Sequence, residues 1–273
     1  FLVVDSGPLY RSGKVEIDAL ERQDASTVQA LAAIAPGTVL TESLLLDVQE
    51  RLQGAGLFES VSVTLDPDPE RAGAATVQVR LREQPVQVFT VGVGLSANTG
   101  PRASLEHVYR RVFGYAVSST NKFELGQVRQ AWTGEVSTHP GERASRWLLG
   151  GAIERLVSDD DVVLSQRLRA GRSQGTRLFE QLVFAEFERG LRQTDAGRTS
   201  TFALSGNVHG VLRRLDSALL PTDGFTLALQ GGLGRSHGSA STSGWFGRAW
   251  GRVTVYRPLG SSWYGQARLE AGQ

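Results

Sequence analysis

Hydrophobic positions recur every second residue over the last two thirds of the chain. From Val86 onward, large apolar side chains alternate with small or polar ones in runs of about ten residues, and turn residues separate the runs. A period of two is typical of β-strands that present one apolar face. We therefore predict eleven strands, near residues 86–96, 101–109, 115–125, 128–138, 146–158, 162–172, 177–189, 199–210, 224–235, 245–257 and 262–273.

The run at residues 200–208 shows this alternation most clearly. Phe202, Leu204 and Val208 fall on one face of the predicted strand, whereas Ser205 and Asn207 fall on the other. The predicted strand at 245–257 has the same two faces, one apolar and one polar. Each strand is thus expected to separate two different environments.

The first 85 residues have a different pattern. Apolar side chains recur at helical spacing after Ser26, which we expect to cap a first helix, and again after Thr41. Short alternating runs lie before and after these helices. The predicted order is strand, helix, helix, strand, strand, a small α+β domain with strands at residues 14–20, 61–65 and 76–81.

Two architectures fit the alternating strands of residues 86–273. A soluble sandwich places polar residues outside, whereas a transmembrane β-barrel places apolar residues toward lipid and polar residues toward its lumen. The length of the strands favours the barrel, because 9–11 tilted residues span a bilayer. Short connections at 139–145, 173–176 and 258–261 alternate with longer ones at 189–198 and 236–244, as in such barrels. The polar faces also carry large charged side chains in mid-strand, namely Arg167, Arg169, Arg248, Arg252 and Arg268.

These arginines admit two interpretations. They could line a conducting pore, or they could pair with carboxylates of the same face and stiffen the wall. We favour pairing, with partners among Glu180, Glu186, Glu188 and Glu270.

The number of predicted strands is odd. Bacterial single-chain barrels have even numbers of strands, and an open sheet would leave unpaired edges in lipid. Gln273 also falls inside a predicted strand. We therefore expect that the barrel has about sixteen strands and that further strands follow Gln273.

Composition narrows the function classes. The net charge of the 273 residues is +1, which gives no global field for nucleic acid, and the absence of Cys excludes disulfides and thiolate sites. The G-x-S-x-G run at residues 234–238 leads into a flexible loop instead of a helix, so we interpret it as a surface loop. Asp159–Asp161 fits a solvated hairpin tip. We expect no catalytic residue, no metal site, no cofactor and no enzymatic activity.

The first 85 residues resemble a POTRA (polypeptide-transport-associated) domain. The resemblance rests on element order and on a motif that combines Gly13, a Gly37 turn with Leu40, and the spacing L-x-x-x-G-x-F-x-x-V. Phe1–Asp5 is similar to the tail of a preceding repeat. The spacing L-x-x-x-G-x-F-x-x-V corresponds to Leu52, Gly56, Phe58 and Val61.

A POTRA domain (residues 1–85) followed by a barrel (residues 86–273) resembles the outer-membrane protein assembly superfamily. In that superfamily a P-x-x-G corner opens the ninth strand, and Pro221, Thr222, Asp223 and Gly224 stand at that place. Arg110 and Arg111 ahead of Gly114 are closer to the TamA-type branch than to the BamA-type branch, which usually carries an asparagine there. The family's R-G-(F/Y) loop is not found in this sequence.

The resemblance implies a factor that inserts or secretes β-barrel clients such as autotransporters in a Gram-negative bacterium. The POTRA domain would lie in the periplasm, and the partners would be outer-membrane lipid, unfolded client proteins and a TamB-like periplasmic protein. Phospholipid movement between membranes is a second implied role, and a two-partner secretion exporter or a passive pore is the alternative.

The resemblance also assigns two strand edges. One would add partner strands to the POTRA sheet. The other is the first barrel strand, which would close only weakly against the last strand and open a seam there. Its Gly92 and Gly94 offer few large cross-strand contacts, so this pairing is expected to be poor. The first edge comprises Ser60, Val61, Ser62, Val63, Thr64 and Leu65, and the second comprises Gln87, Phe89, Val91, Val93 and Leu95.

Overall fold

The computed structural model describes residues 8–273 except 67, 98, 142–143, 159–160, 177, 218–219, 240–242 and 261. The chain forms two compact units. The first comprises Phe1–Val86, Arg110–Ala116 and His139–Ser145, and the second comprises Gln87–Tyr109, Val117–Thr138 and Arg146–Gln273.

The first unit contains a three-stranded sheet and two helices. The strand order in the sheet is β1-β3-β2, with β1 parallel and β2 antiparallel to the central β3. The predicted element order is confirmed. Its elements are β1 (Ser12–Asp18), α1 (Ala25–Ala32), α2 (Glu42–Gly54), β2 (Phe58–Leu65), a 3₁₀ turn (Pro69–Ala74) and β3 (Ala75–Glu83).

The caps of the two helices differ. The predicted cap Ser26 is wrong, because Ser26 lies inside α1 and Asp24 is the N-cap residue, with no side-chain cap bond. Thr41 does cap α2, where its side chain accepts a hydrogen bond from the Leu44 N–H.

One hydrophobic core holds the helices on the sheet. Leu52 and Phe58 are 0% and 2% exposed, and Val61 is also buried, so the apolar members of the predicted motif lie in this core. Gly56 between them has φ +72°, a backbone conformation that glycine adopts without a Cβ clash. Gly13 allows a close approach, because a Cβ there would lie 2.5 Å from the Ala74 carbonyl oxygen.

The first unit also includes the two turn segments 110–116 and 139–145. Arg110 Nε donates to the Gly56 carbonyl at 2.9 Å, and Arg111 pairs with Asp24 at 2.9 Å. His139 is buried, with its Nε2 2.6 Å from the Arg110 carbonyl oxygen, and burial lowers the pKa of the His139 imidazole. The side chains of the turn segments are therefore part of the packing of this unit.

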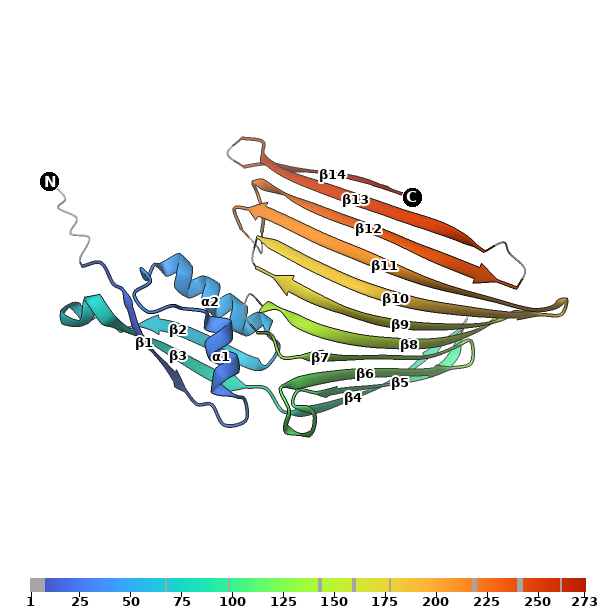
Figure 1. Cartoon of the computed structure of the whole chain (residues 1–273), viewed down its shortest axis with the longest axis horizontal. Helices are drawn as coiled ribbons and strands as arrows, with labels where there is room; N and C mark the ends of the chain where they lie inside the picture. Colours follow the sequence, from blue (N-terminus) through green and yellow to red (C-terminus); the bar gives the residue numbers. More distant parts are fainter. Residues whose placement is uncertain are drawn as a thin grey trace. The chain divides into compact units, whose positions relative to one another are not determined.

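The second unit is an antiparallel sheet of eleven strands in sequence order, from β4 to β14 (Figure 1). All eleven predicted strands are present. Each strand pairs with its neighbours in the chain, so β4 and β14 are the two edges and the sheet is not closed. The strands are β4 (Gln87–Ser96), β5 (Gly100–Tyr109), β6 (Val117–Gly126), β7 (Arg129–Thr138), β8 (Arg146–Ser158), β9 (Asp161–Gly175), β10 (Phe179–Thr194), β11 (Gly197–Leu215), β12 (Gly224–Gly238), β13 (Gly244–Pro258) and β14 (Tyr264–Gly272).

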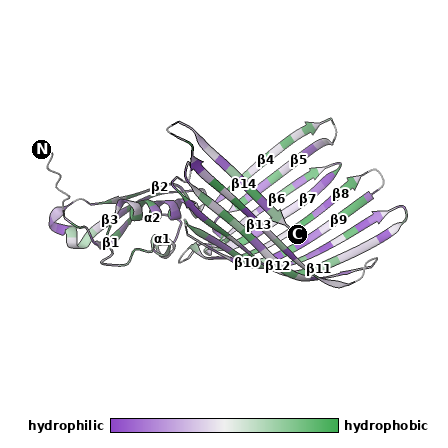
Figure 2. Cartoon of the chain, turned by 90° about the horizontal axis from the view of Figure 1, so that it is seen from above, coloured by the Kyte–Doolittle hydropathy of each residue, from purple (hydrophilic) through white to green (hydrophobic). Residues whose placement is uncertain are grey.

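The two faces of this sheet differ in polarity. Apolar and polar residues alternate along the strands (Figure 2). Val93 and Leu233 are 85% and 72% exposed, whereas Glu186 and Asn207 are each 3% exposed. Apolar side chains thus cover one face, which we name the outer face, and the opposite, inner face carries the buried polar groups. This is the sense of alternation expected for a membrane barrel.

Among the described residues, no helix is both long and apolar enough to cross a membrane.

Two predicted connections are strands in the structure. The supposed long loop at 189–198 is wrong, because β10 continues to Thr194 and β11 begins at Gly197. The G-x-S-x-G run also lies inside β12, which ends at Gly238, so its interpretation as a surface loop is wrong. Asp159 and Asp160 lie outside the described residues, while Asp161 begins β9 and pairs with Arg192 at 2.5 Å. These polar runs extend the hairpins beyond the apolar part of the sheet.

The core of the first unit yields a test of its packing. We expect Leu52→Ala to lower the free energy of unfolding of this unit by about 2–5 kcal/mol, because the truncation leaves a cavity in the core. Leu46→Ala on the same helix removes a side chain that is 48% exposed and should cost less than about 1 kcal/mol. Hydrogen exchange of the β2 and β3 amides measures both changes, and equal effects of the two variants would contradict the assigned core.

Candidate functional site

The first candidate site is the free edge of β2. The structure places Ser60–Leu65 at an edge of the three-stranded sheet, where β2 pairs with β3 alone. Val61 and Val63 are 8% exposed and point to the core. In an antiparallel ladder, backbone groups of alternate residues point away from the partner strand. The edge can therefore accept another strand, and its function as a binding site stays a prediction.

One side chain partly protects this edge. The N–H of Val63 donates to Oε1 of Gln49, a residue of α2, at 3.4 Å. This contact shows that the backbone of Val63 points outward, toward the open side of the sheet. Edge strands are commonly protected by such side chains. The sequence carries no local signal for Gln49, because the contact depends on how α2 packs.

The second candidate site is the edge strand β4. Gln87–Leu95 pairs with β5 in continuous register, and the structure shows Phe89, Val91, Val93 and Leu95 together on the outer face. Their exposed fractions rise from 62% at Phe89 to 85% at Val93, and Leu95 is 84% exposed. The Phe89 ring stacks on His107 of β5, with ring centroids 4.2 Å apart. Lateral opening at this edge stays a prediction.

The glycines of β4 serve its pairing with β5. A Cβ at Gly92 would lie 2.6 Å from Ser104 Oγ, and one at Gly94 would lie 3.0 Å from Arg102 Nε. Both glycines face the inner side and make room for these β5 side chains. The ladder between β4 and β5 is complete, so weak pairing caused by these glycines stays a prediction for the other edge of β4.

The turn before β12 is organised by a residue that the sequence analysis missed. Asp216 accepts hydrogen bonds from the backbone N–H groups of Thr222 and Asp223 at 3.0 and 3.1 Å, and from the Thr222 hydroxyl at 2.6 Å. Led by the Thr222 hydroxyl, these donors lower the pKa of Asp216 to about 2. An aspartate beside a Pro-Thr-Asp-Gly run is a typical turn residue, which is the signal that could have identified it.

Two further features hold the end of this turn that leads into β12. Asp223 Oδ1 accepts from Arg257 of β13 at 3.0 Å. Gly224 has φ +118°, and a Cβ at this position would collide with the carbonyl oxygen of Arg214. The predicted turn residues Pro221, Thr222, Asp223 and Gly224 therefore join β11 and β12 in one register.

The inner face carries a network of ion pairs around one buried carboxylate. Glu186 accepts from Arg169 at 2.7 Å and from Arg248 at 3.1 Å, and Arg248 also donates to Asn207 Oδ1 at 2.7 Å. The Arg169 guanidinium lies over the Phe184 ring at 4.4 Å. The network connects β9, β10, β11 and β13. The predicted pairing of inner-face arginines with carboxylates is confirmed for Glu180, Glu186, Glu188 and Glu270.

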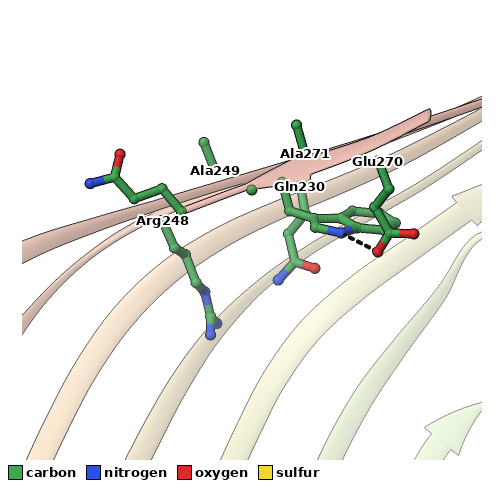
Figure 3. A pocket seen from close by; sticks show the side chains of 8 residues that line it. Gln230, Arg248, Ala249, Glu270 and Ala271 are labelled. Carbon is green, nitrogen blue, oxygen red and sulfur yellow. Dashed lines mark hydrogen bonds between the residues drawn. The ribbon is translucent and has the colours of Figure 1, made fainter.

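A hollow of about 440 Å³ lies at the β14 edge of the sheet and is lined by residues of β12, β13 and β14 (Figure 3). Gln230 and Arg248 point to its side of the sheet, whereas Ala249 and Ala271 point to the other. The indole N–H of Trp250 donates to Glu270 at 2.9 Å. Among the described residues, no group of His, Asp or Glu side chains could hold a metal ion. The lining offers hydrogen bonds and charge, and no arrangement typical of a nucleophile with its base.

We expect Asp216→Ala to raise hydrogen exchange of the Thr222 and Asp223 amides at neutral pH by about tenfold, because both lose their acceptor. Asp195→Ala, in the turn between β10 and β11, is the control. The folded-state pKa of Asp216 lies below its unfolded value of about 3.9. The carboxylate therefore contributes stability at neutral pH that is lost as the pH falls from about 4 toward 2. If the wild type and Asp216→Ala lost the same amount of stability between about pH 4 and about pH 2, this contribution of Asp216 would be contradicted.

Removal of the buried carboxylate should weaken the sheet. We expect Glu186→Ala to lower the free energy of unfolding by about 3 kcal/mol, because Arg169 and Arg248 lose their shared partner. Glu188→Ala should cost less than about 1 kcal/mol, since the Glu188 side chain is 44% exposed. The temperature at which each variant changes its gel mobility from the folded to the unfolded form compares Glu186→Ala with Glu188→Ala. A larger effect of Glu188→Ala would show that Glu186 is not the centre of the network.

No protein-family model and no curated protein sequence matches the chain. Its structure is similar to BamA from Haemophilus ducreyi lacking POTRA domains 1–3, with a TM-score of 0.62 and 12% identity over 98% of this chain and 56% of that one. It is also similar to CdiB from Acinetobacter baumannii, with a TM-score of 0.50 and 13% identity over 96% and 52%. The chain thus spans about half the length of these proteins. At this identity the similarity establishes the fold, and the eleven-stranded sheet resembles that of a BamA-type barrel.

Proposed function

We propose that this chain belongs to a factor that assembles or secretes β-barrel proteins at the outer membrane of a Gram-negative bacterium. The similarity in fold to BamA and CdiB supports this proposal. The apolar outer face supports a location of the sheet in lipid. The elements of the first unit and its buried motif residues support its assignment as a periplasmic POTRA domain. We expect the protein to have no enzymatic activity.

The observation that carries this proposal is the open edge of β4. Its outward backbone groups have no neighbouring strand among the described residues, and its outer face is apolar. A client segment that adds as a strand would satisfy these groups by main-chain hydrogen bonds, whatever its side chains. The seam beside β4 would then open sideways and place the client directly into lipid.

The edge of β2 would provide an earlier step. An extended client or partner segment can add to β2 in the periplasm by the same main-chain hydrogen bonds. Gln49 would limit unspecific pairing, because it occupies the N–H of Val63 in the free protein. The two edges would act in sequence, first capture and then insertion.

We further propose that the factor is of the TamA type. The two arginines ahead of Gly114, where BamA-type chains usually carry an asparagine, support this assignment. A TamB-like periplasmic protein would then be the partner, autotransporters would be among the clients, and phospholipid movement would be a second role.

Single cysteines test the route of the client, since the chain contains no Cys of its own. We expect a client with a cysteine in one strand to form a disulfide with Val91→Cys on β4 during insertion. Val208→Cys presents a half-exposed position on the same face in the middle of the sheet, and Gln230→Cys presents one on the inner face. Non-reducing gels measure the disulfide.

The three positions separate the alternatives. Crosslinking at Val91 alone supports lateral opening. Crosslinking at Gln230 without Val91 would instead support passage through the lumen, as in a passive pore or a two-partner secretion exporter. Equal crosslinking at Val91 and Val208 would indicate unspecific contact and would contradict a role of the β4 edge.

A further inference from the structure

Charge is segregated between the two faces of the eleven-stranded sheet. The cross-strand register puts every carboxylate of these strands on the inner face. Positive charge, by contrast, occurs on both faces. The outer face carries Arg155, Arg172, Arg189, Arg198, Arg214, Arg235 and Arg257.

Three of the outer arginines lie at the same end of alternate strands. Arg155, Arg189 and Arg235 stand on β8, β10 and β12, each a few residues before the strand ends at Ser158, Thr194 and Gly238, respectively. These strands run away from the end of the sheet where β4 begins. Because the spacing of neighbouring strands is about 4.8 Å, the three side chains follow one another at roughly 10–15 Å along this rim.

These three arginines differ in their partners from three arginines of the inner face. Arg167, Arg169 and Arg248 each pair with a carboxylate. Within the part of the chain that the structure describes, no ion pair involves Arg155, Arg189 or Arg235, and the last two are exposed. A guanidinium at the rim of an apolar surface needs an anion, and the described strand residues place no carboxylate on this face.

Aromatic rings lie between these charges. Phe202 of β11 pairs with Arg189 on one side and with His237 on the other. Its ring lies 5.2 Å from the His237 ring and 6.5 Å from the Phe187 ring. Aromatic residues form the girdles of membrane barrels at the depth where lipid headgroups begin. The charge and the rings therefore indicate the same boundary.

We propose that Arg155, Arg189 and Arg235 form a binding row for the phosphate groups of membrane lipids. A guanidinium donates two parallel hydrogen bonds to a phosphate, and the neighbouring apolar residues contact the acyl chains. The spacing suits lipids that carry more than one phosphate. The inference rests on the proposed location of the sheet in a membrane, and it goes beyond it by assigning a specific lipid contact to one rim.

Lipid titration of the native protein in detergent, followed by native mass spectrometry, tests this row. The probes are lipid A with two phosphates, phosphatidylcholine and inorganic phosphate. We expect R189Q/R235Q to weaken binding of the bis-phosphorylated lipid about tenfold or more, because two charged donors are lost. R189K/R235K, which keeps the charge, should bind with intermediate affinity. The control R102Q/R252Q removes two inner-face arginines and should leave affinity within about twofold of the wild type.

The outcomes separate this inference from the proposed function. Unchanged lipid binding by R189Q/R235Q, or equal losses in the control, would overturn the row. Competition by inorganic phosphate at equal concentration would overturn its assignment to a lipid. If the wild-type protein did not remain in membranes after alkaline washing, the proposed function itself would be contradicted. The lipid test applies to variants that remain in membranes and still show a heat-dependent change of gel mobility, because these variants are folded.

Discussion

Every backbone N–H and C=O group in an apolar medium needs a hydrogen-bond partner, and this requirement governs the eleven-stranded sheet. The ladders of the eleven-stranded sheet satisfy it at each internal strand, whereas β4 and β14 have one neighbour each. The small unit has a second open edge at β2, where Gln49 accepts from the Val63 N–H and the other outward groups can bond to water. An open edge in lipid is costly until a strand pairs with it. The proposed function uses this cost as the driving force for capturing clients.

Register decides what each face of the sheet presents. Side chains alternate, so a slip of one residue would move the apolar residues of a strand to the inner face. The turn before β12 prevents such a slip, because Asp216 binds Thr222 and Asp223, and Gly224 fits where a side chain would collide. Correct register of β12 in turn sets the register of β13. Arg248 of β13 can then reach Glu186 of β10. A local turn therefore supports a network that spans β9 to β13.

Alternation along the sequence was sufficient to predict the eleven strands and their two faces, since each strand meets two different environments. It failed at the strand ends. Residues 189–198 are rich in Arg and Gly, a composition that hydropathy assigns to a loop, yet they form the turn end of the β10–β11 hairpin. Backbone pairing continues there outside the apolar region, so hydropathy carries no signal. Gln49 was missed because its partner is selected by the fold, whereas Asp216 carried a local turn signal that was not used. Glu186 could be named as one carboxylate among four but not as the centre of a network.

The different treatment of arginine on the two faces follows from the same ladder. On the inner face, Arg169 and Glu186 stand at matching register positions on neighbouring strands, so the sheet itself supplies the counter-charge there. On the outer face the neighbours of Arg189 are Gln166 and Phe202, and no described strand residue on this face carries a carboxylate. Carboxylates on that face would meet the negative headgroups of a bilayer, and arginines meet them favourably. The arrangement therefore leaves one face complete in itself and the other complementary to a lipid surface.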